Sequence, residues 1–195
     1  MISLLRGHLR EATSGCHGRV DTAFSSFDLA TPDGYAAFLA AQAAALIPIE
    51  QAIERAGIDA VLPDWKQRTR RMALCRDLEN LGIVPPPSVV FVAPDCPAAM
   101  LGMAYVLEGS RLGSAVLLRR VLGGPHTILS TTTEYLRHGA GTGLWQSFLV
   151  TIEAAGFVAS DLVKMTSAAK AVFGAFESAA WLGKSKDANH AENHR

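Results

Sequence analysis

Apolar residues recur at intervals of three and four along most of this chain, the spacing that places them on one face of an α-helix. Alanine and leucine dominate and β-branched residues are sparse, a composition that favours helix over strand. The expected helices span roughly residues 3–25, 35–55, 65–81, 98–122, 131–137, 143–155 and 159–182. The pattern therefore predicts an all-α protein, a single-domain helical bundle.

Prolines mark several of the expected boundaries. Thr31 is a suitable N-cap and Pro32 suits the first turn of the helix that follows. Pro48 lies inside that helix and is expected to bend or interrupt it. Five prolines make residues 83–97 a connector. The apolar run 89–92 within this connector has no partner strand, so we expect no sheet there.

Length and composition bound the organisation and the location of the protein. The 195 residues suffice for one domain with a sizeable core. We expect residues 1–182 to form this domain and the polar residues 183–195 to be a disordered tail. Every hydrophobic stretch is broken before it reaches transmembrane length. The residues up to Glu11 are too polar for a signal peptide. Together with three cysteines that fit reduced thiols, these features predict a cytoplasmic protein without a membrane.

The charges balance, because 18 lysines and arginines face 18 aspartates and glutamates. An overall basic field that would gather nucleic acid is therefore absent. Two local clusters stand out, one of Arg68, Arg70 and Arg71 and one of Arg119 and Arg120. Such clusters are usually solvated helix faces, and the alternative is a docking patch for an acidic redox partner.

An imidazole on the first helix is the strongest candidate for a ligand-binding group. Arg10 lies seven residues before His17, and Thr13 and Asp21 lie four residues to either side. Residues at these spacings share one helical face, so a metal ligand and a cation could address one elongated ligand. A lone histidine on a helix is more often a surface or core residue, and its significance therefore depends on what faces it.

A strip of small residues interrupts an otherwise good helix at positions 109–114. Gly109 and Gly113 lie four residues apart, and each is followed by a serine, Ser110 and Ser114. Each interior glycine costs a helix about 0.5–1 kcal/mol relative to alanine. Close packing of two helices is the commoner explanation for such a strip. The alternative is that a flat ligand lies against the exposed backbone.

The two motifs together carry a family resemblance. The run Leu-Arg-Glu-Ala-Thr followed by His17, within residues 9–21, resembles the proximal-histidine helix of haem oxygenases. The strip at 109–114 is similar to their distal helix, whose pattern is Gly-Asp-x-x-Gly-Gly. Ser110 occupies the position of the aspartate in that pattern, and Ser114 occupies that of the last glycine.

The resemblance extends over about residues 9–182, and its connecting motifs at 34–39 and 64–78 look like the bacterial branch that accompanies bacteriophytochromes. It implies an enzyme that cleaves protohaem, or haem b, oxidatively to biliverdin, carbon monoxide and iron. Haem is then both substrate and cofactor. The chain has no flavin or nicotinamide fingerprint, so electrons must come from a separate ferredoxin or reductase. The biliverdin would pass to a bacteriophytochrome.

The resemblance also assigns roles to residues. It implies that His17 holds the iron and that Gly109 and Gly113 bring the backbone close to the distal face. Ser110 would order distal water, which makes these last three the catalytic candidates. The expected haem contacts are Arg10, Thr13, Asp21, Tyr105, Ser114, Phe148 and Phe173. Arg10 would meet a propionate, and Thr13 or Asp21 would bind the second nitrogen of the imidazole.

Two other classes of function stay open. The first is a haem carrier or sensor that kept the fold and lost turnover, and the neutral Ser110 favours it. The second is a haem-free enzyme of the thiaminase or pyrroloquinoline-quinone type. It is favoured because Thr142 and Gln146 are neutral where haem oxygenases place cations for the propionates. His17 in its motif speaks against it.

Overall fold

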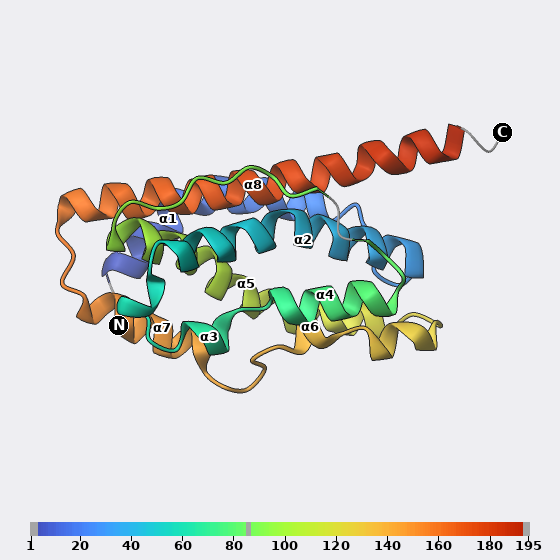
Figure 1. Ribbon diagram of the computed structural model, residues 1–195, viewed down its shortest axis with the longest axis horizontal. Coiled ribbons are helices and arrows are strands. Elements are labelled where there is room, and N and C mark those ends of the chain that lie inside the picture. Colours follow the sequence, from blue (N-terminus) through green and yellow to red (C-terminus); the bar gives the residue numbers. More distant parts are fainter. Residues whose placement is uncertain (1–3, 85–86, 193–195) are drawn as a thin grey trace.

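The computed structural model describes residues 4–84 and 87–192, with side chains as far as residue 182. Within these ranges all regular structure is helical, which confirms the predicted fold class. Four long helices lie side by side: α1 (Leu4–Phe24), α2 (Pro32–Arg55), α5 (Pro97–Leu122) and α8 (Ala159–Glu192) (Figure 1). The shorter elements are η1 (Ile58–Ala60), α3 (Trp65–Arg68), α4 (Arg71–Asn80), η2 (Thr127–Thr131), α6 (Glu134–Arg137) and α7 (Leu144–Ala154).

Helix α8 is the element on which the other long helices pack. It contacts α1, α2 and α5. Helix α1 runs parallel to α8. His8 lies 3.4 Å from Thr166, and Arg19 donates to Glu177 at 3.0 Å, so both contacts join residues 158 positions apart in the chain. Gly102 lets α5 approach α8 closely, since a Cβ there would collide with the backbone of Met165. Small residues thus set how near α5 comes to α8.

Pro48 does not interrupt α2, contrary to one of the two outcomes that its position predicts. The helix is continuous from Pro32 to Arg55. Proline has no N–H, so the carbonyl of Ala44, four residues earlier, has no donor within the helix. The N–H of Val89 in the connector donates to this carbonyl at 3.0 Å. The connector therefore satisfies the group that Pro48 leaves unpaired, and this bond holds the connector on α2.

We predict that Pro48→Ala will loosen this attachment. Alanine supplies a helical N–H to the carbonyl of Ala44, and this donor competes with Val89. The Val89 amide should then exchange with deuterium several-fold faster than in the wild-type chain, as measured by hydrogen exchange with NMR detection. Pro94→Ala in the same connector is the control and should leave Val89 protected. Unchanged protection of Val89 in Pro48→Ala would contradict this account of the connector.

The predicted helix at 65–81 is two helices, α3 and α4. The backbone is extended at Thr69, with ψ at 136°. The N–H groups of Arg70 and Arg71 donate to the carboxylate of Glu50 on α2, at 2.7 and 3.1 Å. These amides bind a buried carboxylate in place of helix carbonyls, so a new helix begins at Arg71. The prediction of one helix was wrong because the carboxylate comes from a distant part of the sequence.

Two further boundaries differ from expectation. The helix predicted at 131–137 is shorter than expected: α6 begins only at Glu134, and η2 ends at Thr131 before it. Asp77 on α4 accepts the N–H groups of Glu134 and Tyr135, at 3.0 and 2.9 Å, and so caps α6. Helix α8 continues to Glu192, past the end expected at 182. Residues 193–195 and the side chains from 183 onward lie outside the described part, and the division at 182 with its disordered tail stays a prediction.

Helix α2 is the one described helix with the length and hydropathy to cross a membrane. Its apolar window has a mean hydropathy of 1.5, although the sequence pattern predicted no stretch of this kind. Within the fold, 61% of that window is buried. Core positions such as Leu39, Leu46 and Ile53 are fully buried. The apolarity of α2 therefore fits a core helix that packs on α4 and α8.

Candidate functional site

His17 lies on the exposed side of α1 with its ring held by two neighbours. The Nδ1 atom is 2.9 Å from a carboxylate oxygen of Asp21, and the side chain of His17 is 64% exposed. The ring meets the edge of Phe173 on α8, with the centroids 5.9 Å apart. A neutral imidazole that donates Nδ1–H to this carboxylate presents Nε2 as its acceptor nitrogen.

Thr13 and Arg10 take different places on the same helix. The hydroxyl of Thr13 donates to the carbonyl of Leu9 at 2.7 Å, and the residue is buried. Of the two residues expected beside the second nitrogen of His17, Asp21 is therefore the one in contact. Arg10 is exposed, and it lies close enough to Tyr105 on α5 for its charge to act on the phenol.

The glycine strip of α5 faces open space. A Cβ on Gly113 would meet no atom within 4 Å, and one on Gly109 would reach only ordinary contact with Trp145, at 3.7 Å. By contrast, Gly102 is pressed against the backbone of α8. Helix packing thus explains Gly102 but does not explain Gly109 or Gly113.

Two contacts flank the exposed part of α5: one joins α1 to α7, and the other joins the residues after α5 to those before α2. Near the start of α1, Arg6 lies over the ring of Trp145, 5.9 Å from its centroid. At the far end of α5, Gly124 packs so closely on Ala30 that a Cβ would collide with its carbonyl oxygen. Between these points Leu112 and Val116 of α5 are 57% and 44% exposed. In the chain, His17 of α1 lies between Arg6 and Ala30.

Aromatic residues line the end of this region near Arg10. Tyr105 lies 5.6 Å from Trp145 between ring centroids, and Trp145 stacks on Phe148 at 6.0 Å. Burial raises the pKa of Tyr105, and the charges of Arg6 and Arg10 partly offset the rise. Phe148 is fully buried and supports Trp145 from behind. Of the two expected phenylalanines, Phe173 is the one that reaches the imidazole.

The side chains of Ser110 and Ser114 differ in their surroundings. Ser110 is exposed, and its Oγ lies 2.8 Å from the carbonyl of Leu107 in its own helix. Arg70 donates to the same Oγ at 2.8 Å and to the Leu107 carbonyl at 2.9 Å. Ser114 is half-buried one turn further on. The candidate distal group is therefore a serine bonded to a buried guanidinium.

The arginine cluster near 70 is interior, and its assignment to a solvated face or a docking patch was wrong for Arg68 and Arg70. Both are 2% exposed. Arg68 donates to Glu108 at 2.8 Å and to both carboxylate oxygens of Asp64 at 2.7 Å. It also donates to the carbonyl of Leu144 at 2.8 Å. The cluster is buried because acidic and carbonyl partners converge on it. Arg119 and Arg120 are exposed, as the pattern predicts.

Arg111 extends this network to the loop after α6. It bonds Glu108 at 3.0 Å, the carbonyl of Arg68, and the carbonyl of His138 at 3.1 Å. Burial lowers the pKa of His138, and the positive charges of Arg111 and Arg70 lower it further. Burial likewise raises the pKa of Glu50 beside the α4 start. The charged groups packed against α5 therefore hold its turn around Gly109 in place.

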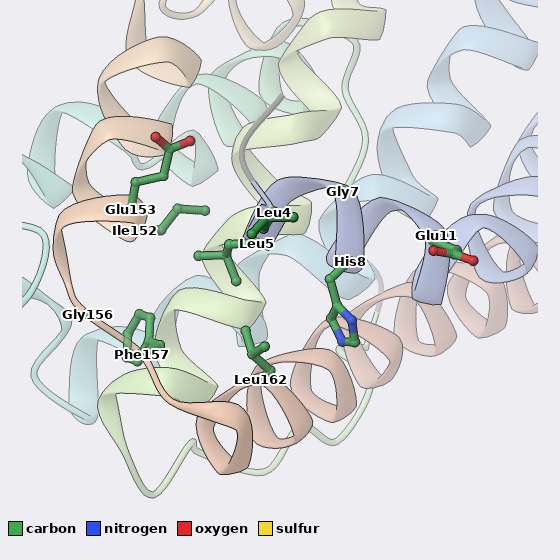
Figure 2. Close-up of a pocket in the computed structure, with 10 residues that line it drawn as sticks. All are labelled: Leu4, Leu5, Gly7, His8, Glu11, Ile152, Glu153, Gly156, Phe157 and Leu162. Atoms are coloured by element: carbon green, nitrogen blue, oxygen red, sulfur yellow. The ribbon is translucent and has the colours of Figure 1, made fainter. Parts of the chain in front are cut away.

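Two cavities occur elsewhere on the described surface. One, of about 880 Å³, lies among the first turns of α1, the end of α7 and the start of α8, with His8, Glu11 and Glu153 at its rim (Figure 2). The other, of about 830 Å³, lies between residues 89–95 and α8. Neither is lined by His17 or by the glycine strip. Neither cavity therefore coincides with the expected ligand surface.

Sequence reasoning missed several residues that shape this region. Arg6 precedes Arg10 by four residues, the spacing that places both on one face, and this signal was present. Trp145 lies in the helix expected at 143–155, and no motif there marked it as part of the site. The pairing of Arg70 with Ser110 joins residues 40 apart in the chain, and nothing in the local pattern indicates it.

Comparisons with known proteins agree with this fold. No protein-family model matches the chain, and none of the curated proteins matches its sequence. Among solved structures, the arrangement of helices is that of a heme oxygenase. The similar structure is of the NO- and CO-bound heme oxygenase from Neisseria meningitidis, and it superposes on this chain with a TM-score of 0.78 at 20% sequence identity. The match covers 93% of this chain and 92% of that chain, so the likeness concerns the whole fold.

We predict that Glu108→Ala will destabilise the protein strongly. The side chains of Glu108 and Arg68 are each 1% exposed, so the substitution leaves Arg68 buried with one partner fewer. Removing one partner of a buried pair typically costs about 3–5 kcal/mol. The free energy of unfolding, measured with urea, should fall by roughly that amount. Glu153→Ala, at an exposed position of α7, is the control. A loss below about 1 kcal/mol, as for a surface pair, would contradict the buried network.

Proposed function

We propose that the protein binds haem between α1 and α5, with His17 as the iron ligand, and cleaves it oxidatively as a haem oxygenase. The observation that carries the proposal is the pairing of an oriented imidazole with an unfilled glycine strip. Asp21 holds Nδ1 of His17 at 2.9 Å, and a Cβ on Gly113 would meet nothing within 4 Å. The shared fold with the Neisseria meningitidis heme oxygenase supports this reading.

The residues of α1 fit an axial ligand. A histidine that donates one ring N–H to a carboxylate is a better donor through its other nitrogen, because the carboxylate fixes the tautomer and raises the basicity. Phe173 against the ring edge restricts rotation of the imidazole. Asp21 and Phe173 would together aim Nε2 away from α8 and toward the ligand.

The residues of α5 fit the opposite face of a flat molecule. Gly109 and Gly113 expose the helix backbone, and Leu112 and Val116 offer apolar surface beside them. When bound, haem would supply the iron that reacts with dioxygen, and the protein would supply a ligand, an apolar surface and hydrogen-bond donors. Ser110, with Ser114 one turn on, would order water on this side.

Arg6 and Arg10 are the proposed partners of the haem propionates. Arg6 lies over Trp145, which packs on Tyr105, and the charges of Arg6 and Arg10 both lower the pKa of that phenol. Guanidinium groups bind carboxylates with two parallel hydrogen bonds, and Tyr105 adds a phenolic donor. This pair of cations on α1 would replace the cations missing at Thr142 and Gln146. Haem would then be oriented by its carboxylates toward the start of α1.

The rest of the proposed reaction concerns partners. Electrons would come from a ferredoxin or another reductase, and the exposed Arg119 and Arg120 near the end of α5 are suitable for docking an acidic one. The product would be biliverdin, passed to a bacteriophytochrome in the cytoplasm. These assignments rest on the resemblance of the motifs and on the charge of this surface.

A non-catalytic haem carrier is the second candidate. The hydroxyl of Ser110 lies 2.8 Å from a carbonyl of its own helix, which competes with any distal ligand for its proton. If the proton stays there, the chain can hold haem without turning it over.

Spectroscopy of the protein with haemin separates these functions. Haemin binding should shift the Soret band, and a reductase system in air should bleach it while a red biliverdin band grows. A Soret band that persists under these conditions would identify a carrier. An absent shift would overturn haem binding and favour the haem-free alternative.

The matched variants test the iron ligand. His17→Ala should lose the axial-histidine spectrum and weaken haemin binding by roughly tenfold or more. His8→Ala, on the same helix and outside the proposed site, should keep both. An unchanged axial-histidine signature in His17→Ala would exclude His17 as the ligand.

A further inference from the structure

Arg70 is a buried cation that hydrogen-bonds one exposed residue of α5, Ser110. Its guanidinium donates from Nη2 to Ser110 Oγ at 2.8 Å and to the carbonyl of Leu107 at 2.9 Å. Arg70 is 2% exposed, whereas Ser110 is exposed. A ligand on this side of α5 can therefore contact Ser110 but not Arg70.

Two further contacts fix the position of Arg70. The guanidinium lies over the ring of Tyr135, 5.1 Å from its centroid, a cation–π contact in the interior. The Tyr135 hydroxyl donates to Gln42 at 2.8 Å, which holds the ring. The backbone N–H of Arg70 binds Glu50 at 2.7 Å. Side chain and backbone are thus both held, and the guanidinium has little freedom to leave Ser110.

The Leu107 carbonyl has more donors than lone pairs. A carbonyl oxygen has two lone pairs. The N–H of Arg111, four residues on in a continuous helix, uses one, and Arg70 uses the other. The hydroxyl of Ser110, 2.8 Å away, is the third donor for this oxygen. Arg70 therefore competes with Ser110 for its internal acceptor.

Arg70 also changes the hydroxyl itself. It donates to Ser110 Oγ, and a hydroxyl that accepts a charge-assisted hydrogen bond becomes a stronger donor. Both effects act in one direction. Both favour donation by the Ser110 hydroxyl toward the exposed face of α5 over donation to Leu107.

We infer that Arg70 is a positioning residue that turns Ser110 into a hydrogen-bond donor toward the ligand side of α5. The inference rests on the proposed function, because it assigns the distal donor of the same site. The carboxylate of the haem oxygenase pattern is replaced here by a neutral hydroxyl supported by a buried cation.

Other charged groups lie around Arg70, and a measurement of its effect must be compared with theirs. Glu50 lies on α2, and Arg68, Arg71 and Asp64 lie at the α3–α4 junction. Glu108 and Arg111 on α5 and His138 after α6 complete the set. Of these, Arg71 lies next to Arg70 in the chain and pairs with Glu54 at 2.6 Å, which makes it a suitable control.

The carbon monoxide complex of the reduced, haem-loaded protein tests the inference. A donor or positive charge near the bound carbon monoxide lowers its infrared stretching frequency, and removing it raises that frequency. Ser110→Ala and Arg70→Met should each shift the band to higher wavenumber. Arg70→Met added to Ser110→Ala should give little further shift, because the effect of Arg70 passes through Ser110. Arg71→Met should leave the band in place.

The outcomes are distinguishable. An unmoved band in Ser110→Ala would overturn the inference, and so would equal shifts from Arg70→Met in both backgrounds. Ser110 is exposed, so its variant tests the inference even if Arg70→Met does not fold, and Arg70→Lys should then shift the band only in part. A wild-type chain that takes up no haemin would overturn the proposed function and this inference together. Uptake of haemin with an unmoved band would overturn the inference alone.

Discussion

The buried pair of Arg68 and Glu108 is the interaction on which the candidate site depends. It joins α3 to α5 at 2.8 Å, with both side chains 1% exposed. The same guanidinium binds the carbonyl of Leu144 and the hydroxyl of Ser147, so α7 is joined as well. Arg111 binds back to the carbonyl of Arg68. One turn of α5 is thereby fixed to the α3–α4 junction and to α7.

This arrangement explains how α5 can carry exposed glycines without losing its position. Glycine weakens a helix, and Gly113 gains no packing contact in return. The charged network on the opposite side of the helix supplies the restraint instead. Buried ion pairs contribute specificity of structure more reliably than net stability. Among the described residues every buried side-chain nitrogen and oxygen has a hydrogen-bond partner, so the network imposes no unpaired polar group. One face of α5 is therefore left free for a ligand.

The sequence predicted the helical class, the long helices and the two motifs because these are local properties. Periodicity, caps and the glycine spacing all act within a few residues. Long-range pairing was not predictable in the same way. Arg68 and Arg70 were predicted to be surface charges because several of their partners lie between 37 and 79 residues away in the chain. Pro48 was expected to bend or interrupt α2, and its continuity was not predictable because the compensating donor, the N–H of Val89, belongs to the connector. The break at Thr69 depends on Glu50 for the same reason.

The most direct test of the account is the position of iron in crystals of the protein with haemin. Anomalous scattering at the iron edge locates the metal without reference to the reaction. The account predicts one strong peak between α1 and the glycine strip of α5, at coordination distance from Nε2 of His17. A peak in the cavity beside His8, or one on the surface away from His17, would contradict it.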